Sequence, residues 1–312
     1  MKHIVKLLAA AAFAASTVVA SAMAQDVRVV VVSHGQANDP FWSVVKNGVS
    51  QAAEDMKISV DYRAPESYDM VVMAQLIDAA VSQEPDGLVV SIPDADALGP
   101  AIQRAVAAGI PVISMNSGSD VSKGLGAALH VGQEEYDAGL AAGEALKASG
   151  GSKALCFNHE VGNVALDLRC EGFAKGFGGN VTVVPTTNDF AEIRSKVRAA
   201  LDADPDVDTV LMLGASTAGE PALAALEESD RIGAIKLATF DMSANFLAAV
   251  ADGKAEFCID QQQYLQGYLP VVFLANNARF GLMPGGNVAS GPNLVTKDKA
   301  AQVVELSAKG IR

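Results

Sequence analysis

Short apolar runs alternate with amphipathic stretches along the chain from Val27 onward. The runs are rich in Val, Ile and Leu and have few polar residues at alternate positions, which is typical of strands buried on both faces of a sheet. The predicted strands are Val27–Val32, Gly87–Val90, Val112–Met115, Lys153–Phe157, Thr209–Leu213, Lys236–Phe240 and Glu256–Ile259.

The stretches between these strands have the spacing of amphipathic helices. Apolar residues recur at i, i+3, i+4 and i+7 in Ile102, Ala105, Val106 and Gly109, and a second such set is Val72, Leu76, Ala79 and Ala80. Strands and helices that take turns predict an α/β fold with parallel sheets covered on both faces. The turn-rich region after Phe280 predicts one late strand that crosses between domains, followed by a short C-terminal helix.

An internal similarity divides the chain into two halves. The segment Glu84–Val90 closes a helix and opens a strand, and Asp204–Val210 does the same. Gly109–Asn116 likewise has a counterpart in Gly233–Asp241. A chain of 312 residues also exceeds the roughly 250–300 residues at which one core stops growing. Two similar α/β domains are therefore predicted, with chance similarity of repeated strand and helix ends as the alternative.

The first 24 residues have the three parts of a secretory signal peptide. Lys2 and Lys6 form the charged end, an apolar run extends from Leu7 to Val19, and Ala22-Met23-Ala24 is the small-residue cleavage site. We expect cleavage after Ala24. Because no Cys follows that site to accept a lipid, the mature chain is expected to be free in an exported compartment.

Charge and cysteine content narrow the possible partners. The chain has 23 Lys and Arg against 36 Asp and Glu, so its surface would repel a phosphate backbone and nucleic-acid binding is not expected.

An oxidising compartment permits a disulfide among Cys156, Cys170 and Cys258, with Cys156–Cys170 as the favoured pair. The alternative is that all three are buried free thiols.

Polar residues follow the predicted strands, where parallel sheets bind ligands. They are Ser33-His34-Gly35, Asn38-Asp39-Pro40-Phe41-Trp42, Asn116-Ser117, Asn158-His159, Ser216-Thr217, Asp241 and Asp260-Gln261. Carboxylates and amides bind hydroxyl groups, and an aromatic ring covers the C–H face of a sugar. The set predicts a site for a polyhydroxylated ligand that needs neither metal nor cofactor. Two alternatives stay open: Phe41 and Trp42 can be plain core, and Asp241 can cap the helix that follows.

Enzyme motifs are incomplete. Gly214-Ala215-Ser216-Thr217-Ala218 approaches the G-x-S-x-G nucleophile elbow, but Ala218 replaces the last Gly. That fold also needs a His after the Ser, whereas all four His precede Ser216. His34 and His159 could meet around a metal, but two lone His more often form simple hydrogen bonds. No enzymatic activity is predicted.

The segments named next carry a family resemblance over nearly the whole mature chain. They are Asn38–Trp42, Val44–Gly48, Ala107–Ile113, Cys170–Phe173, Phe240-Asp241 and Ile259–Gln261. Together they resemble the type I periplasmic sugar-binding proteins, the ribose- and galactose-binding group that serves ATP-driven (ABC) importers.

The resemblance implies two doubly wound parallel-sheet lobes joined by three chain crossings and closing on the ligand like jaws. The crossings are expected near Leu129–His130, Gln261–Gln262 and Ser290–Pro292. The N-terminal lobe would then comprise residues 25–129 and 262–290, and the C-terminal lobe residues 130–261 and 291–312. A monomer in the periplasm is implied, with the permease and ATPase subunits at the inner membrane as partners.

The resemblance also implies roles for individual residues. Phe41 and Trp42 would sandwich the sugar with Phe190 of the other lobe. Asp241 and Gln261 match a carboxylate and an amide that bind hydroxyls, and Asp39 stands at a polar contact. Further candidates for ligand contacts are His34, Asn116, Ser117, Asp167, Arg169 and Ser216.

Departures from the ribose-binding pattern bear on the ligand. Asn116-Ser117 stands where ribose binders have Asp-Arg, and Asp167 replaces an Arg, with Arg169 two residues later. Ribose is therefore not the expected ligand, and a polyol such as xylitol or threitol, or another monosaccharide, fits better.

Two functions of other classes share this fold. The presence of an Asp at the start of a helix, Asp167, also resembles the autoinducer-2 binders of the same fold, so a receptor for a small diffusible signal is the main alternative. A ligand-responsive repressor is disfavoured by the predicted signal peptide and by the lack of a basic helix-turn-helix segment before Val27.

Overall fold

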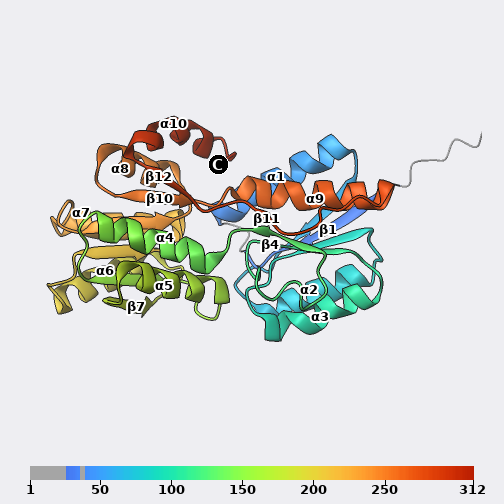
Figure 1. The fold of residues 1–312 in the computed structure, drawn as a ribbon, viewed down its shortest axis with the longest axis horizontal. Helices are drawn as coiled ribbons and strands as arrows, with labels where there is room; N and C mark the ends of the chain where they lie inside the picture. Colours follow the sequence, from blue (N-terminus) through green and yellow to red (C-terminus); the bar gives the residue numbers. More distant parts are fainter. Residues whose placement is uncertain (1–25, 36–38) are drawn as a thin grey trace, which may run out of the picture.

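The computed structural model describes residues 26–35 and 39–312, which form two lobes side by side along the long axis of the molecule (Figure 1). Each lobe has one six-stranded sheet with helices on both faces. The predicted α/β class with two doubly wound lobes is confirmed. The predicted signal peptide, its cleavage after Ala24, and Asn38 lie outside the described residues.

The first lobe has the strand order β11-β5-β4-β3-β1-β2, and all neighbouring strands are parallel. Its strands are β1 Arg28–Val32, β2 Ser59–Arg63, β3 Gly87–Val90, β4 Val112–Met115, β5 Leu129–Gly132 and β11 Val288–Ala289. Helices α2 (Met70–Val81) and α3 (Ala95–Ala107) cover one face of the sheet. Helices α1 (Pro40–Met56) and α9 (Gln263–Phe280) cover the other.

The second lobe has the order β12-β10-β9-β8-β6-β7, and only the pairing of β12 with β10 is antiparallel among its described strands. Its strands are β6 Ala154–Asn158, β7 Val181–Pro185, β8 Thr209–Met212, β9 Lys236–Phe240, β10 Phe257–Asp260 and β12 Asn293–Thr296. Helices α4 (Glu135–Ala148) and α5 (Val164–Phe177) cover one face. The other face is covered by α6 Phe190–Ala203, α7 Glu220–Glu228, α8 Ala244–Asp252 and α10 Lys297–Ala308.

The chain passes between the lobes at three places. It crosses after β5, between β10 and α9 at Gln261–Gln262, and between β11 and β12 at Ser290–Pro292. Strand β5 extends to Gly132 in the first sheet, so the first crossing lies three residues beyond the expected Leu129–His130. His130 lies in this strand with its ring buried and hydrogen-bonded through Nδ1 to Ser114 Oγ at 2.8 Å. Because this polar residue interrupts the apolar run, the hydrophobicity pattern does not predict the strand.

Helix α2 buries a different stripe from the predicted one. Its fully buried residues are Met73, Ile77 and Ala80, whereas Val72 is 38% exposed. The helix is apolar on almost every side, so its sequence permits several stripes with helical spacing and the packing against the sheet selects one. No helix in the described part of the chain is long and apolar enough to cross a membrane.

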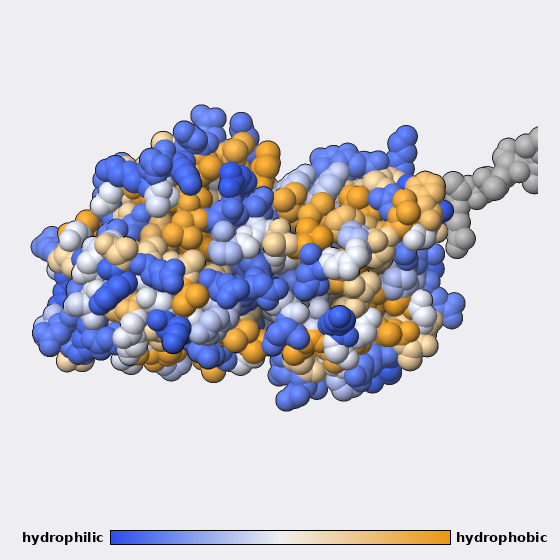
Figure 2. Space-filling view, in the orientation of Figure 1, coloured by the Kyte–Doolittle hydropathy of each residue, from blue (hydrophilic) through white to orange (hydrophobic). Residues whose placement is uncertain are grey.

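Cys156 on β6 and Cys170 on α5 form a disulfide within the second lobe. Cys258 on β10 is buried and free. The surface where the two lobes meet is largely hydrophilic in the view of Figure 2.

Candidate functional site

A cavity lies between the lobes, at the ends of strands from both sheets. The first lobe contributes His34, Asp39, Phe41, Trp42 and Asn116. The polar residues that the second lobe contributes are His159, Glu160, Asn163, Arg169, Ser216, Thr217, Asp241 and Gln261. Parallel strands expose unpaired backbone groups and helix N-termini at this end, so polar side chains gather there.

Three of the twelve residues predicted individually as ligand contacts do not line the cavity. Ser117 is buried behind it and donates a hydrogen bond to Asn116 Oδ1 at 3.1 Å. Asp167 accepts a hydrogen bond from Asn158 Nδ2 at 2.8 Å. Phe190 opens α6, is 45% exposed, and has the Arg194 guanidinium 5.9 Å from its ring. The remaining residues predicted individually as ligand contacts all line the cavity, and they are His34, Asp39, Phe41, Trp42, Asn116, Arg169, Ser216, Asp241 and Gln261.

Sequence reasoning missed polar residues in the loop after β6. Glu160 lines the cavity two residues beyond the end of this strand, and Asn163 follows as the N-cap of α5, accepting a hydrogen bond from Ala165 N at 3.1 Å. The signal that could have found them is the same strand-end rule, extended beyond Asn158-His159 to the start of the next helix.

The aromatic pair at the start of α1 serves the cavity and the core together. Trp42 is 5% exposed and packs in the core between α1 and the sheet, while also lining the cavity. Its ring centroid lies 5.1 Å from that of Phe41 and 4.8 Å from that of His34, both in edge-to-face geometry. A Cβ atom at Gly35 would lie 2.0 Å from the Trp42 ring, so only glycine leaves room for the indole.

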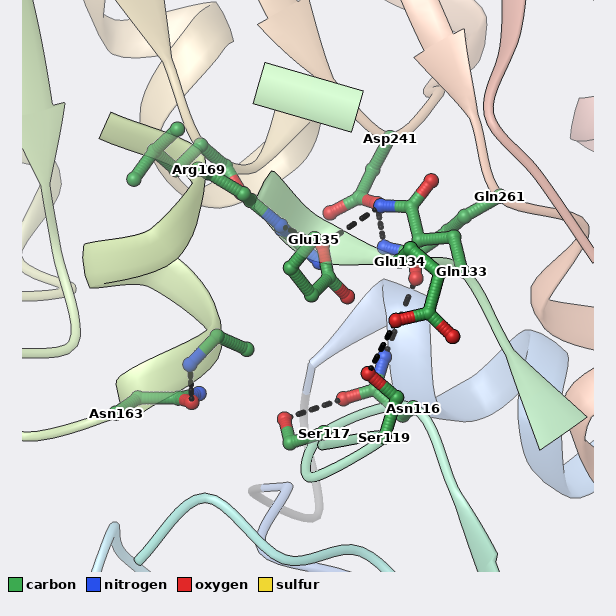
Figure 3. Close-up of polar contacts among 12 residues, drawn as sticks. Asn116, Ser117, Ser119, Gln133, Glu134, Glu135, Asn163, Arg169, Asp241 and Gln261 are labelled. Atoms are coloured by element: carbon green, nitrogen blue, oxygen red, sulfur yellow. Dashed lines mark hydrogen bonds and ion pairs between the residues drawn. The ribbon is translucent and has the colours of Figure 1, made fainter. Parts of the chain in front are cut away.

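Asn116 and Asp241 occupy matching positions, one residue past β4 and one past β9. Both have a left-handed backbone, with φ of 63° and 66°. Asn and Asp tolerate this conformation better than most residues with a Cβ atom. Gln261 connects the two, because its Nε2 donates to Asp241 Oδ1 and its Oε1 accepts from Asn116 Nδ2 at 3.3 Å (Figure 3).

Arg169 is held in a buried ion pair. Its Nε and Nη2 donate to the two carboxylate oxygens of Glu135 at 2.6 and 3.0 Å, and both side chains are less than 5% exposed. Its Nη1 donates to the Leu213 carbonyl at 3.3 Å, and the guanidinium lies 4.5 Å from the centroid of the Phe240 ring. Gln133 Nε2 donates to Glu135 at 2.9 Å, which completes a network that fixes Arg169 at the cavity wall (Figure 3).

Burial changes the protonation of the groups that line the cavity. Burial, assisted by the charge of Arg169, lowers the pKa of His34 and of His159 to about 3, so both rings are neutral. Burial raises the pKa of Asp39 to about 6 and that of Asp241 to about 7, although Arg169 and the Gln261 hydrogen bond oppose the rise at Asp241. Burial likewise raises the pKa of Glu160.

The arrangement suits a small ligand with many hydroxyl groups. Carboxylates and amides face the cavity from both lobes, next to an aromatic pair. Within the described residues, no group of three or more His, Cys, Asp or Glu has the arrangement of a metal site.

Comparisons with known proteins agree on one family. A model of a periplasmic binding protein domain matches residues 14–281. A carbohydrate transporter structure from Acidothermus cellulolyticus 11B, in complex with myo-inositol, is 34% identical and superimposes with a TM-score of 0.87 over 92% of this chain and 99% of that one.

Two curated relatives are more distant. The ribose import binding protein RbsB of Escherichia coli is 29% identical over 269 residues, which cover 84% of this chain and 87% of that protein. The xylose/arabinose-binding protein XylF of Sulfolobus acidocaldarius is 26% identical over 260 residues. That match covers 78% of this chain and 64% of the relative, so this chain spans less than two thirds of its length.

Proposed function

Because this chain belongs to the periplasmic binding protein family, we propose that it is the solute-binding component of an ABC importer and that it binds a monosaccharide or a polyol between its lobes. Members of this family bind solutes and are not enzymes. The proposal places the mature protein in the periplasm as a monomer, after cleavage of the signal peptide, with the permease and ATPase subunits as partners.

The observation that carries the proposal is the set of carboxylates and amides that face one cavity from both lobes beside Phe41 and Trp42. A hydrogen bond to a charged group contributes roughly 1.5–3 kcal/mol, so a few such bonds plus ring contacts reach the ~8 kcal/mol of a micromolar complex. Arg169, the cation among the described lining residues, is already paired with Glu135. A ligand carboxylate or phosphate would therefore lack a free partner there.

The relatives support this ligand class. The similar structures and proteins carry myo-inositol or are named for ribose, xylose and arabinose. Asn116 and Ser117, in place of the charged pair expected of a ribose binder, favour a ligand other than ribose. Asp167, on which the likeness to autoinducer-2 binders depends, lies outside the cavity, so a nutrient role is the better supported one.

Closure of the lobes supplies the means of capture. Asn163 Nδ2 lies 3.5 Å from His34 Nε2, and Val164 N donates to the Pro93 carbonyl at 3.1 Å, so two contacts join the second lobe to the first beside the cavity. A ligand that bridges both lobes would favour this closed form over an open one, and the closed form would present a distinct surface to the permease.

Calorimetric titration tests the proposal. The panel comprises myo-inositol, xylitol, threitol, xylose, arabinose and ribose, and we expect a dissociation constant of about 1 μM for at least one of the first five. Asp241→Ala should weaken binding of that solute by about 10–100-fold, because a charged hydrogen-bond acceptor is lost. Asp167→Ala and Phe190→Ala are matched controls outside the cavity and should leave affinity unchanged. Absence of binding across the panel, with tight binding of an amino acid or a metal ion, would overturn the proposal.

A further inference from the structure

A buried glutamine behind the cavity bonds to two of the residues that line it. Gln266 lies on α9, is fully buried, and is not part of the cavity wall that the described residues form. Its Oε1 accepts a hydrogen bond from Asn116 Nδ2 at 3.2 Å. Its Nε2 donates toward Gln261 Oε1 at 3.0 Å, the Gln261 carbonyl oxygen at 3.1 Å and Ser290 Oγ at 3.0 Å. One side chain thus joins two cavity residues to the third crossing between the lobes.

The backbone carbonyl of Gln261 fixes which way these side-chain amides point. A carbonyl oxygen can only accept, so the Gln266 atom that faces it is the NH2 group, and Gln266 Oε1 faces Asn116. The Asn116 atom at that contact must then be the donor Nδ2. By the same rule, the Gln261 atom that faces Gln266 Nε2 is Oε1, which leaves Gln261 Nε2 to donate to Asp241 Oδ1. The donors and acceptors of this network therefore have a single arrangement.

This arrangement limits what the two cavity amides can offer a ligand. Both protons of Asn116 Nδ2 have acceptors, Gln266 Oε1 at 3.2 Å and Gln261 Oε1 at 3.3 Å. Asn116 Oδ1 accepts from Ser117 Oγ at 3.1 Å and keeps one lone pair (Figure 3). Gln261 is the reverse, because its Oε1 accepts twice and only one of its Nε2 protons is bonded, to Asp241. Within the described part of the chain, Asn116 is left as an acceptor and Gln261 as a donor.

We propose that Gln266 is a positioning residue for ligand selection, which holds Asn116 as an acceptor and Gln261 as a donor toward the ligand. This inference rests on the proposed function, because it concerns the solute of the same cavity. The ligand group that meets Asn116 must then donate, which a hydroxyl does and a fluorine, keto oxygen or ether oxygen does not. A ligand with an acceptor at that point would leave two buried acceptors facing each other, so the site rejects it more strongly than a missing contact would.

A second glutamine on α9 separates a positioning role from simple packing. Gln263 is 1% exposed, one helical turn before Gln266, and its Oε1 has no hydrogen-bond partner among the described residues. Replacing either glutamine by Met keeps the length of the side chain and removes its amide. Only Gln266→Met, however, releases Asn116 and Gln261 from their fixed orientations, so Gln263→Met is the matched control.

Fluorinated ligands test the inference by calorimetry. The probe is the tightest binder among myo-inositol, xylitol, threitol, xylose and arabinose, compared with its monodeoxyfluoro derivatives, in which one hydroxyl at a time becomes an acceptor only. For the native protein, we expect at least one derivative to bind about 100-fold or more weakly than its parent. In Gln266→Met the Asn116 amide can turn its NH2 group toward the fluorine, so this preference for the parent should fall about tenfold or more. Gln263→Met should keep the native preference.

The outcomes separate the inference from the proposed function. If Gln266→Met weakens parent and derivatives equally and leaves every preference unchanged, Gln266 has only a structural role and the inference is overturned. The proposed function then still stands, because the native protein binds the parent solute. If none of the five solutes binds, the proposed function itself fails.

Exchange of side-chain amide protons, measured by NMR, tests the orientation without a ligand. The Asn116 Nδ2 protons should exchange with solvent about tenfold or more faster in Gln266→Met than in the native protein or in Gln263→Met. Ser290→Ala removes one acceptor of Gln266 Nε2 but leaves the Gln261 carbonyl, so it should keep both the slow exchange and the ligand preference. Equal exchange rates in Gln266→Met and the native protein, or a loss of preference in Ser290→Ala as large as that in Gln266→Met, would contradict the inference.

Discussion

The first and second lobes share one sheet order, yet they hold their parts of the site by different means. In the first lobe, α1 carries Phe41 and Trp42 and packs against α9, and the core holds both in place. In the second lobe, α4 and α5 pack together with the Cys156–Cys170 disulfide and the buried ion pair of Glu135 with Arg169. The lobe that presents the buried Arg169 is thus the one with added constraints, because a misplaced buried charge costs far more than a misplaced ring.

Both helix pairs approach through glycines that face a neighbouring backbone. A Cβ atom at Gly172 on α5 would lie 2.0 Å from the Tyr136 carbonyl oxygen, and one at Gly48 on α1 would lie 2.1 Å from that of Tyr264. The close approach is therefore common to both lobes, whereas the disulfide and the buried ion pair belong to the second. Four predictions separate these contributions, in order of decreasing effect.

Removing Glu135 should produce the largest loss. In Glu135→Ala the Arg169 guanidinium stays buried without its partner, so the free energy of unfolding should fall by about 3–5 kcal/mol. Urea unfolding followed by circular dichroism measures the loss, with Glu144→Ala on the exposed side of α4 as the control. Hydrogen exchange should increase in α4 and α5 before it increases in α1 and α9. Equal increases in both lobes would contradict the difference described here.

Removing the disulfide should have the next largest effect. The bridged residues are 14 positions apart, and closing a loop of that length stabilises a protein by about 3 kcal/mol. The double variant Cys156→Ser with Cys170→Ser should melt earlier than the native protein in a thermal scan. Its melting should not respond to dithiothreitol, whereas that of the native protein should. A response of the variant to dithiothreitol would point instead to a disulfide between two molecules through Cys258.

Alanine at the interhelical glycines should affect both lobes alike. Gly172→Ala and Gly48→Ala each force two backbones apart, which costs about 1–3 kcal/mol. Gly285→Ala, where an added Cβ would meet nothing within 4 Å, is the matched control. Both core variants should also weaken ligand binding, since α5 carries Arg169 and α1 carries Trp42. A loss confined to Gly172→Ala would show that the second lobe alone depends on close helix packing.

The smallest effect concerns the matching pair Asn116 and Asp241. The pKa of Asp241 is about 7 in the folded protein and ~3.9 when the chain is unfolded, so the native state holds its proton more strongly. The stability of the ligand-free protein should therefore decrease as pH rises from about 4 to about 7. The change should be about 1 kcal/mol or less, because the lobes can open and rehydrate the carboxyl group. Asp241→Asn gives the second lobe the residue of the first and should flatten this part of the pH profile.

The central strands could be predicted from sequence because they are continuous apolar runs. The edge strands β2 and β7 could not, since they alternate exposed and half-buried residues in a way that loops also do. The late strand and C-terminal helix predicted after Phe280 correspond to β12 and α10.

The site could be predicted where side chains directly follow a strand, as at Asn116, Asp241 and Gln261. Predictions within helices were right for Phe41, Trp42 and Arg169 and wrong for Asp167 and Phe190, because they depend on which side of the helix faces the cavity. Asp167 and Arg169 are two residues apart on α5 and so point to nearly opposite sides, yet that helix has no clear amphipathic pattern to say which side faces inward. Nor does sequence reveal the pairing of Arg169 with Glu135, which are 34 residues apart and meet only through the packing of α4 on α5.

The three crossings between the lobes have a consequence for the order of folding. The first lobe needs α9 and β11, and the second needs β12 and α10, so both cores lack a layer or an edge until the chain beyond residue 262 is available. Domains generally fold as units as they emerge during synthesis. Here neither lobe is complete before its C-terminal elements are available, so we expect both lobes to reach their final fold only late in synthesis.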